Sequence, residues 1–342
     1  MPRPRASQSI SLPIAFRAVV AERILITGGA GFIGSNVADR LLADGHEVIA
    51  YDNLSTGRRE FLADALNHPS FRLVEGDILD AEALGGAMQD VDAVVHFAAN
   101  ADVRFGLDHP ERDLQQNTIG TFTVLEAMRG AGVGRITFAS SGSVYGEPKV
   151  FPTPEDCPFP NQTSLYGASK LAGEGLIQGY CEGYGLSGVI LRFVSIMGER
   201  YTHGHLFDFV QALRDEPTRL TVLGDGKQRK SYLYIGDCVN AVVGLLDRHR
   251  DAGCHSYNLG TDEVTVVDRS VEVICTHMGI SPQITHTGGE RGWVGDSPLI
   301  HLDCAKLRAT GWVPELTIEQ AVQRTLSWFD DNPWVFDARG SA

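Results

Sequence analysis

The amino-acid sequence predicts an α/β fold, a doubly wound parallel sheet with a smaller mixed part near the C-terminus. Short, nearly continuous apolar runs alternate with helix-like segments up to about residue 195. Each run is followed by Gly, Asp, Asn or Ser, which is typical of a buried parallel strand ending at a ligand-binding edge. Beyond that point, stretches containing Gly, His and Pro replace the alternation, so we expect a substrate-binding part there.

The expected strands are Arg23–Thr27, Glu47–Tyr51, Phe71–Val74, Ala93–Phe97, Arg135–Ala139 and Gly188–Phe193. Three helix-like segments lie between them, Ser35–Ala43, Asp113–Ala131 and Tyr166–Tyr184. The last two are amphipathic and fit either a helical dimer face or ordinary helices that cover a sheet. Further on, Tyr232–Leu246 is typical of a helix and His255–Gly260 of a strand, so we expect the chain to return to the main sheet.

These patterns predict a division of the chain into three parts. Residues 1–20 contain an apolar patch that Arg17 interrupts and no cleavage signal, so we expect a dispensable, disordered leader. Residues 21–195, joined by 232–260, are expected to bind a nucleotide cofactor. Residues 196–231 and 261–335 are expected to bind the substrate.

Composition excludes several classes of protein. The formal net charge of -14, without a run of Lys or Arg, argues against nucleic-acid binding. Six widely spaced cysteines form no zinc-binding pattern, so we expect reduced thiols in a cytoplasmic protein and no metal. No uncharged run approaches the roughly 18 residues of a membrane-spanning helix, so no membrane partner is expected.

A glycine-rich turn follows the first expected strand. Gly28, Gly31 and Gly34 stand at the spacing G-x-x-G-x-x-G and open a helix-like stretch. Glycines at these places permit a tight turn and close approach of the backbone to a pyrophosphate, and the start of the helix supplies amide donors. A glycine set of this kind is weak evidence alone, but its position between a strand and a helix favours a dinucleotide site.

Asp52 ends the second expected strand, where a carboxylate can accept hydrogen bonds from both hydroxyls of the adenosine ribose. This placement favours NAD over NADP. Asp52 also fits a simple turn, and Arg58 and Arg59 nearby leave room for NADP.

The third and fourth expected strands end in further candidates. Asp77 and Ile78 are placed to frame the adenine, although Gly-Asp is also a common turn. Phe97, Ala98 and Ala99 provide small residues past which a cofactor can lie, and ordinary packing explains them equally.

Tyr166 and Lys170 stand four residues apart and therefore share one face of a helix. Lowering a phenol pKa from about 10 to about 7 requires roughly 4 kcal/mol of stabilisation, which an ammonium and a positive nicotinamide ring can share. Ser141 and Ser143 follow the fifth expected strand, where their hydroxyls can bond a reacting sugar oxygen. Tyr-x-x-x-Lys alone is more often a surface pair, and its order with the preceding motifs strengthens it.

Together the glycine turn, Tyr51-Asp52-Asn53, Ala98-Ala99, Asn117, Ser141, Tyr166 and Lys170 resemble the extended short-chain dehydrogenase/reductases, the NAD-dependent sugar epimerase/dehydratase family. The resemblance covers about residues 22–329. It implies a Rossmann domain, bound NAD, a nucleoside-diphosphate sugar as substrate and a homodimer. The cofactor residues that it implies, with those above, are Gly28, Gly31, Phe32, Ile33, Gly34, Asp52, Asn53, Ser55, Thr56, Gly57, Asp77, Ile78, Phe97, Ala98, Ala99, Asn117, Tyr166, Lys170 and Val194.

The resemblance also implies a reaction. Tyr166 takes the proton of the sugar 4-hydroxyl while hydride leaves C4, Ser141 holds the oxygen, and Lys170 binds the nicotinamide ribose and lowers the pKa of Tyr166. The 4-keto sugar turns and takes hydride back on its other face. Dehydratases of the family resemble one another in an Asp-Glu pair where this chain has Gly142 and Ser143, and decarboxylases usually keep that Glu, which leaves 4-epimerisation.

The substrate side departs from the family pattern. The residues expected to contact substrate are Ser141, Gly142, Ser143, Arg192, Ser195, His205, Leu206, Arg229, Lys230, Arg291 and Asp296. Gln228-Arg229-Lys230-Ser231 stands where Gln-Thr-Arg-Asp is frequent, and Trp293-Val294-Gly295-Asp296 replaces Arg-Pro-Gly-Asp, so Arg229 or Lys230 and Arg291 are expected to face the diphosphate.

Two further positions bear on the substrate. His203 and His205 fit a nucleotide or sugar contact, loop packing or, least well, a metal. Arg192, with Arg104 and Arg200 behind it, is the candidate for a sugar carboxylate such as that of UDP-glucuronate, although related enzymes acting on neutral hexoses also carry Arg at that place. A small Ile300 in place of a bulky gate residue leaves room for larger substituents.

The sequence leaves other functions open. The leading hypothesis is a UDP-hexose or UDP-glucuronate 4-epimerase. A nucleotide-sugar reductase or dehydrogenase with net hydride transfer is the second, and a noncatalytic NAD-sensing protein is the third.

Overall fold

The computed structural model describes residues 20–103, 105–158, 161–293 and 295–337. Residues 1–19 of the expected leader, Arg104 and Val294 lie outside the described residues.

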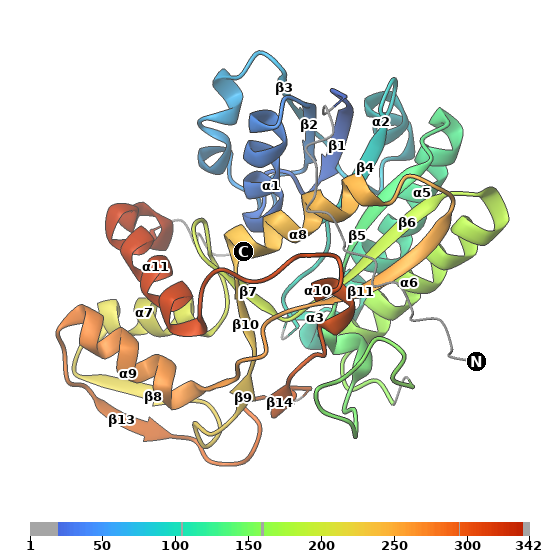
Figure 1. Cartoon of the computed structure of the whole chain (residues 1–342). Coiled ribbons are helices and arrows are strands. Elements are labelled where there is room, and N and C mark those ends of the chain that lie inside the picture. Colours follow the sequence, from blue (N-terminus) through green and yellow to red (C-terminus); the bar gives the residue numbers. More distant parts are fainter. Residues whose placement is uncertain (1–19, 104, 159–160, 294, 338–342) are drawn as a thin grey trace, which may run out of the picture.

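A seven-stranded parallel sheet forms the centre of the described chain (Figure 1). The strand order is β11-β6-β5-β4-β1-β2-β3. The chain adds β2 and β3 on one side of β1 and the later strands on the other side, and doubly wound sheets bind ligands at this change of side, between β1 and β4. The strands are β1 (Arg23–Thr27), β2 (Glu47–Asp52), β3 (Phe71–Glu75), β4 (Ala93–His96), β5 (Arg135–Ser141), β6 (Ser187–Phe193) and β11 (Gly253–Leu259). The predicted doubly wound fold is thus confirmed.

Helices cover both faces of the sheet (Figure 1). One face carries α1 (Phe32–Ala43) and α8 (Ile235–Arg248), and the other carries α2 (Ala81–Ala87), α5 (Gly120–Ala131) and α6 (Leu165–Tyr184). Two large groups of buried side chains, one per face, and a small third group form the core of the described residues.

Local sequence sets the ends of α6, the helix of the Tyr-x-x-x-Lys motif. The Ser164 hydroxyl caps its start by accepting a 3.0 Å hydrogen bond from the Gly167 amide. Gly185 ends it in the left-handed conformation, with φ of 72°.

Most of the elements after β6 form the smaller part and its links. They are α7 (His205–Asp215), β8 (Arg219–Val222), β9 (Arg229–Lys230), β12 (Thr265–Val266), α9 (Val267–Met278), β13 (Gln283–His286), β14 (Leu299–Ile300), α10 (Ala305–Arg308) and α11 (Ile318–Asp331), with the pair β7 (Ser195–Met197) and β10 (Tyr232–Tyr234). The short strand β9 lies between β12 and β14, and β13 pairs with β8.

The structure corrects two expected helices. Tyr232–Tyr234 is a strand paired with Ser195–Met197, and the helix starts only at Ile235. The segment Asp113–Ala131 divides into a π-helical turn, η3 (Asp113–Ile119), and α5, because side chains of η3 turn inward to hydrogen-bond buried groups.

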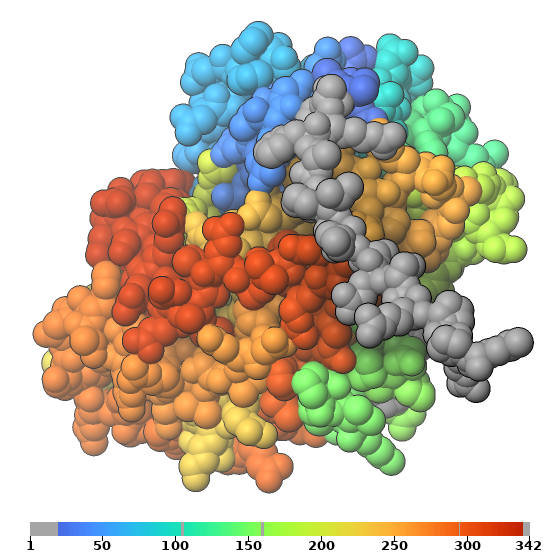
Figure 2. Space-filling model, in the orientation of Figure 1, coloured from blue at the N-terminus to red at the C-terminus, as the bar shows by residue number. Residues whose placement is uncertain are grey.

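The C-terminal segment packs against the cofactor half of the chain. Figure 2 shows it in red between the blue residues of the N-terminal part and the orange residues that precede it in the chain. Trp328 of α11 and Trp334 of η5 (Pro333–Phe336) contact Phe61 of η1 (Arg59–Leu62), with ring centres 6.4 and 5.9 Å apart. Within the described residues, no helix has the length and apolar character needed to cross a membrane.

Candidate active site

The glycine turn forms a cradle that fits a dinucleotide. Gly28 has φ of 69°, and a Cβ there would lie 2.7 Å from the Ala98 backbone nitrogen. A Cβ on Gly34 would lie 2.2 Å from the Gly28 carbonyl oxygen. The turn leads directly into α1 at Phe32, whose first amides are available to a pyrophosphate.

Asp52 lies at the end of β2 beside this cradle, and its side chain is buried. Its two oxygens accept hydrogen bonds from the amides of Ala30 (2.9 Å) and Leu54 (2.8 Å), which fix the carboxylate at the strand end. Gly57 packs against it, since a Cβ there would lie 2.6 Å from Asp52 Oδ1. Asn53 donates a 3.0 Å hydrogen bond to Asp77 and brings the ends of β2 and β3 together.

The two arginines that leave room for NADP have other partners. The Arg58 guanidinium lies 5.8 Å from the ring centre of Trp334 and 6.0 Å from that of Phe61. Arg59 forms an exposed ion pair with Glu75. Within the described residues neither arginine pairs with the Asp52 carboxylate, and this arrangement suits NAD.

Ser55 and Thr56 lie with Asn53 in the exposed loop after β2, where Ser55 Oγ donates to Asn53 Oδ1 at 2.7 Å. Phe32 is mostly buried in the core and Ile33 packs against it at the start of α1. Ile78, Ala98 and Val194 are packed inside, so their contribution to a cofactor site is shape.

The structure brings Ser141, Tyr166 and Lys170 together at the end of β5. Lys170 is buried, and its Nζ donates a 2.9 Å hydrogen bond to the Ala139 carbonyl and lies 6.0 Å from the Tyr166 ring centre. Ser141 hydrogen-bonds Tyr166, and its Oγ accepts the Ser143 amide at 3.1 Å. The expected grouping is therefore present.

The ionisation of this group differs from what the helix spacing predicts. Burial raises the pKa of Tyr166 to about 12, and the hydrogen bond with Ser141 offsets only part of that rise. Burial lowers the pKa of Lys170 to about 8, against an opposing effect of Asp113. Without a bound ligand the phenol is neutral at pH 7, so Lys170 alone does not prepare it as a base.

The bonds of the Asn117 side chain are all made within the protein, and its contact with a cofactor stays a prediction. Its buried amide oxygen accepts the Asn100 amide at 2.8 Å, and its nitrogen donates to Ser169 Oγ at 2.9 Å, to the Asn100 carbonyl and to Asp113. The amide is used entirely within the protein, where it ties the chain after β4 to α6.

Arg192, the expected partner of a sugar carboxylate, is bound by groups of the protein instead. Its guanidinium is 3% exposed, forms two hydrogen bonds to the Glu174 carboxylate at 2.9 and 2.8 Å, and donates to Tyr145 and to the Glu155 carbonyl. These bonds use four of the five N–H donors of the guanidinium, so it has no pair of donors left for a bidentate contact with a sugar carboxylate. Arg200 is the other candidate arginine within the described residues, and it forms an ion pair with Asp39 at 2.6 Å.

On the substrate side, Lys230 is the cation that lies among the candidate residues Asp296 and His205. It forms an ion pair with buried Asp296 and lies 4.8 Å from the Trp293 ring centre. His205 lies close enough for Lys230 to lower its pKa, which burial brings to about 3. The buried His205 Nε2 has no hydrogen-bond partner among the described residues, which suits a ligand contact by a neutral imidazole.

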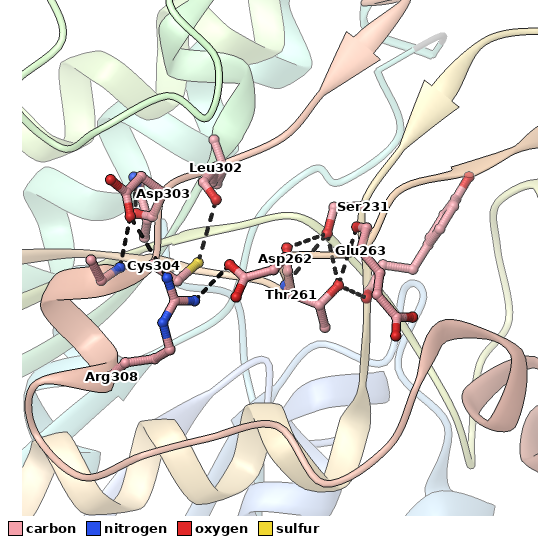
Figure 3. Close-up of polar contacts among 11 residues, drawn as sticks. Ser231, Thr261, Asp262, Glu263, Leu302, Asp303, Cys304 and Arg308 are labelled. Atoms are coloured by element: carbon pink, nitrogen blue, oxygen red, sulfur yellow. Dashed lines mark hydrogen bonds and ion pairs between the residues drawn. The ribbon is translucent and has the colours of Figure 1, made fainter.

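Figure 3 shows how the segment after Lys230 is held. The buried Ser231 hydroxyl bonds the carbonyl and the hydroxyl of Thr261, both at 3.1 Å, and its amide donates to the Ile300 carbonyl. These bonds fix Lys230 relative to the loop after β11 and to the strand that carries Ile300.

The other substrate candidates are placed unequally. Arg229 is exposed, and the alternation of side chains along β9 puts it on the opposite side from Lys230. Arg291 pairs with Glu147 and donates to the Asp296 carbonyl at 3.1 Å, so it lies at the rim. Leu206 is fully buried, whereas Ser195 is exposed at the start of β7.

Gly142 and Ser143 begin η4 (Gly142–Tyr145) next to the catalytic group. A Cβ on Gly142 would lie 3.5 Å from Leu302 and 3.7 Å from Ile300, so apolar side chains surround that position. Within the described residues, no group of three His, Cys, Asp or Glu side chains is arranged to hold a metal.

Comparison with known proteins decides the family. The profile of the NAD dependent epimerase/dehydratase family matches residues 24–260. The chain belongs to this family. It is an NAD-dependent epimerase, an isomerase, as the sequence predicted.

Three relatives show how far the similarity extends. A UDP-glucose 4-epimerase of Mycolicibacterium smegmatis is 35% identical over 90% of this chain and 98% of its own. A solved UDP-galactose 4-epimerase is 38% identical with a TM-score of 0.82, covering 91% of this chain and all of its own (100%). The Thermus thermophilus UDP-glucose 4-epimerase, solved with NAD, is 32% identical with a TM-score of 0.80 over 91% and 99%.

Proposed function

We propose that this epimerase inverts C4 of a nucleotide sugar, a UDP-hexose or UDP-glucuronate, through a transient 4-keto sugar. The observation that carries the proposal is the grouping of Ser141, Tyr166 and Lys170 with no carboxylate at positions 142 and 143. Elimination of water needs a further acid and base, whereas inversion at C4 needs only a group that removes and returns one proton.

NAD, held by the glycine cradle and Asp52, supplies the acceptor and donor of hydride when bound. Tyr166 takes the proton of the 4-hydroxyl and returns it to the same oxygen after inversion. Ser141 hydrogen-bonds that oxygen and the phenol, which holds them at transfer distance. Burial and the charge of Asp113 raise the pKa of the phenol, and we propose that the positive charge of Lys170, on the same helix, favours its ionised form during the reaction.

Lys230 is the residue that we propose for the diphosphate. Its ammonium is near His205 and Trp293, and Asp296 neutralises it when no anion is bound. We propose that the unpaired His205 Nε2 also contacts the ligand.

Between the two sugars, the described residues favour a neutral hexose. Both oxygens of the buried Glu174 carboxylate hold the Arg192 guanidinium, so Arg192 does not offer it to a sugar carboxylate.

The test is to incubate the purified protein, without added NAD, with UDP-glucose and separately with UDP-glucuronate, and to follow the anomeric protons by NMR. We expect the galacto-configured product from UDP-glucose and much less conversion of UDP-glucuronate. Conversion of UDP-glucuronate alone would reverse the choice of sugar. No product in either tube, even after NAD is added, would refute both substrates.

We also propose a homodimer formed through one helical face. Exposed apolar side chains gather on η3, α5 and the start of α6, namely Leu114, Ile119, Phe122 and Leu165. Light scattering should give twice the chain mass, and Phe122→Glu should give the monomer. Leu223→Glu, at an exposed apolar residue elsewhere, is the control that should leave the dimer intact.

We propose a cytoplasmic location, which the six free thiols support.

A further inference from the structure

Asp113 is a buried carboxylate near the catalytic group that the proposed reaction does not use. It is 1% exposed and begins the π-helical turn η3. Its Oδ1 accepts hydrogen bonds from the side-chain amides of Asn100 (2.9 Å) and Asn117 (3.3 Å). Its Oδ2 is buried without a hydrogen-bond partner among the described residues.

Lys170 is a buried ammonium without a carboxylate in direct contact among the described residues. Its buried ammonium makes a hydrogen bond to the Ala139 carbonyl and lies 5.0 Å from the Phe138 ring centre. In the part of the chain that the structure describes, no carboxylate forms a contact ion pair with it. A buried ammonium is strongly destabilised unless an anion compensates it, and a buried carboxylate needs a cation in the same way.

The local structure connects the two residues. The Asn117 amide that donates to Asp113 also donates to Ser169 Oγ, one residue before Lys170. A Cβ on Gly106 would lie 2.1 Å from Asp113 Oδ2, so the glycine leaves the space that the carboxylate occupies. The two charges act on each other: Asp113 raises the pKa of Lys170, and Lys170 lowers that of Asp113.

The other titratable groups around the pair do not replace Asp113. His96 of β4 is neutral, because burial lowers its pKa to about 3. Tyr166 is neutral at pH 7, and Glu174 on the same helix is held by Arg192 and Ser140. Asp102 interacts with Asp113 from the exposed side and raises its pKa.

We propose that Asp113 is a positioning residue that keeps the buried Lys170 protonated at the catalytic group. The role of Lys170 in the reaction rests on the proposed function, whereas its charge can be measured without any turnover.

The experiment is NMR titration of the holoenzyme labelled with ¹³C at lysine Cε, in which the Lys170 signal is the one missing from Lys170→Met. In Asp113→Asn we expect the pKa of Lys170 to fall by about one unit or more, the effect of losing a nearby opposite charge. The matched control is Asp237→Asn, which removes another buried carboxylate of raised pKa, one that accepts the amides of Glu315 and Leu316 far from Lys170. An unchanged Lys170 pKa in folded Asp113→Asn would overturn the proposal.

The reciprocal measurement covers the case in which Asp113→Asn does not fold. In Lys170→Met the Asp113 carboxyl, followed by ¹³Cγ-aspartate labelling, should titrate at a higher pH than in the unaltered chain, and an unchanged pKa would refute the pairing. If 4-epimerisation is observed, the alkaline limb of kcat/KM should move to lower pH in Asp113→Asn and stay in place in Asp237→Asn. A shifted lysine pKa in a protein without epimerase activity would refute the proposed function and leave this proposal standing.

Discussion

At the scale of single residues, Tyr166 is the clearest case in which burial opposes the ionised form that the proposed reaction needs. The phenol sits where water is excluded, and this raises its pKa to about 12 although the reaction needs the phenolate. The hydrogen bond with Ser141 offsets this rise only in part, so we expect the phenol to lose its proton only when substrate and cofactor fill the site.

Replacing Tyr166 by Phe removes the proton acceptor while keeping the ring. We expect kcat to fall by about 10²- to 10⁴-fold, the usual contribution of a general base, with NAD affinity and melting temperature unchanged. Calorimetric titration of NAD and an NMR turnover assay measure both. Tyr180→Phe is the control, since this tyrosine lies on the same helix with its hydroxyl 2.6 Å from Glu126, and it should retain activity. Equal losses in both variants would point to damage of the helix.

Replacing Arg192 by Met separates a structural from a substrate-binding role. We expect a loss of about 3–5 kcal/mol in the free energy of unfolding, because the buried Glu174 loses its cation. The double variant Arg192→Met/Glu174→Gln should recover much of this loss in urea unfolding, and KM should change little in either protein. A higher KM with unchanged stability would restore Arg192 as a substrate ligand.

At the scale of elements, the sheet was predictable and the small strands were not. Each buried parallel strand is a continuous apolar run with a turn residue after it, so β1 to β6 stand out in the sequence. β9, β12 and β14 have two residues each, too few to show a period. Glu174 was missed for a related reason: its partner Arg192 is 18 residues away and is brought to it only by packing of α6 on β6.

His96 links three elements and makes their packing sensitive to acid. Its ring bridges the hydroxyls of Thr27 in β1 (2.6 Å) and Thr121 in α5 (3.0 Å), and burial lowers its pKa from 6.5 to about 3. The unfolded chain therefore binds a proton that the folded chain refuses, so stability is full above pH 6.5 and falls as the pH drops toward 3.

For this single group the loss is about 2 kcal/mol at pH 5. Urea unfolding measures the loss of unfolding free energy between pH 7 and pH 5. We expect this loss to be about 2 kcal/mol smaller in His96→Gln than in the unaltered chain. An identical pH dependence in both proteins would show that His96 titrates normally.

In the described molecule as a whole, the C-terminal segment packs against the part of the chain that carries the glycine cradle. The cofactor cradle belongs to the first strands, yet Trp328 and Trp334 pack against Phe61 just after the loop that follows Asp52. One group of buried side chains also runs from α1 through α8 to α7 and α11. We therefore propose that the nucleotide-binding and substrate-binding parts unfold together.

This coupling can be read from the tryptophans, because all four stand at or beyond residue 293, whereas the proposed NAD site lies in the N-terminal half. Adding NAD at about 100 times its Kd to cofactor-free protein stabilises the folded chain by about 2.7 kcal/mol. We expect the melting temperature from tryptophan fluorescence to rise by the same amount as that from far-ultraviolet circular dichroism. NADP at the same concentration should give a much smaller rise, because Asp52 repels a 2′-phosphate. A rise in circular dichroism alone would mean that the two parts unfold separately and that the contacts of Phe61 with the C-terminal rings do not transmit cofactor binding.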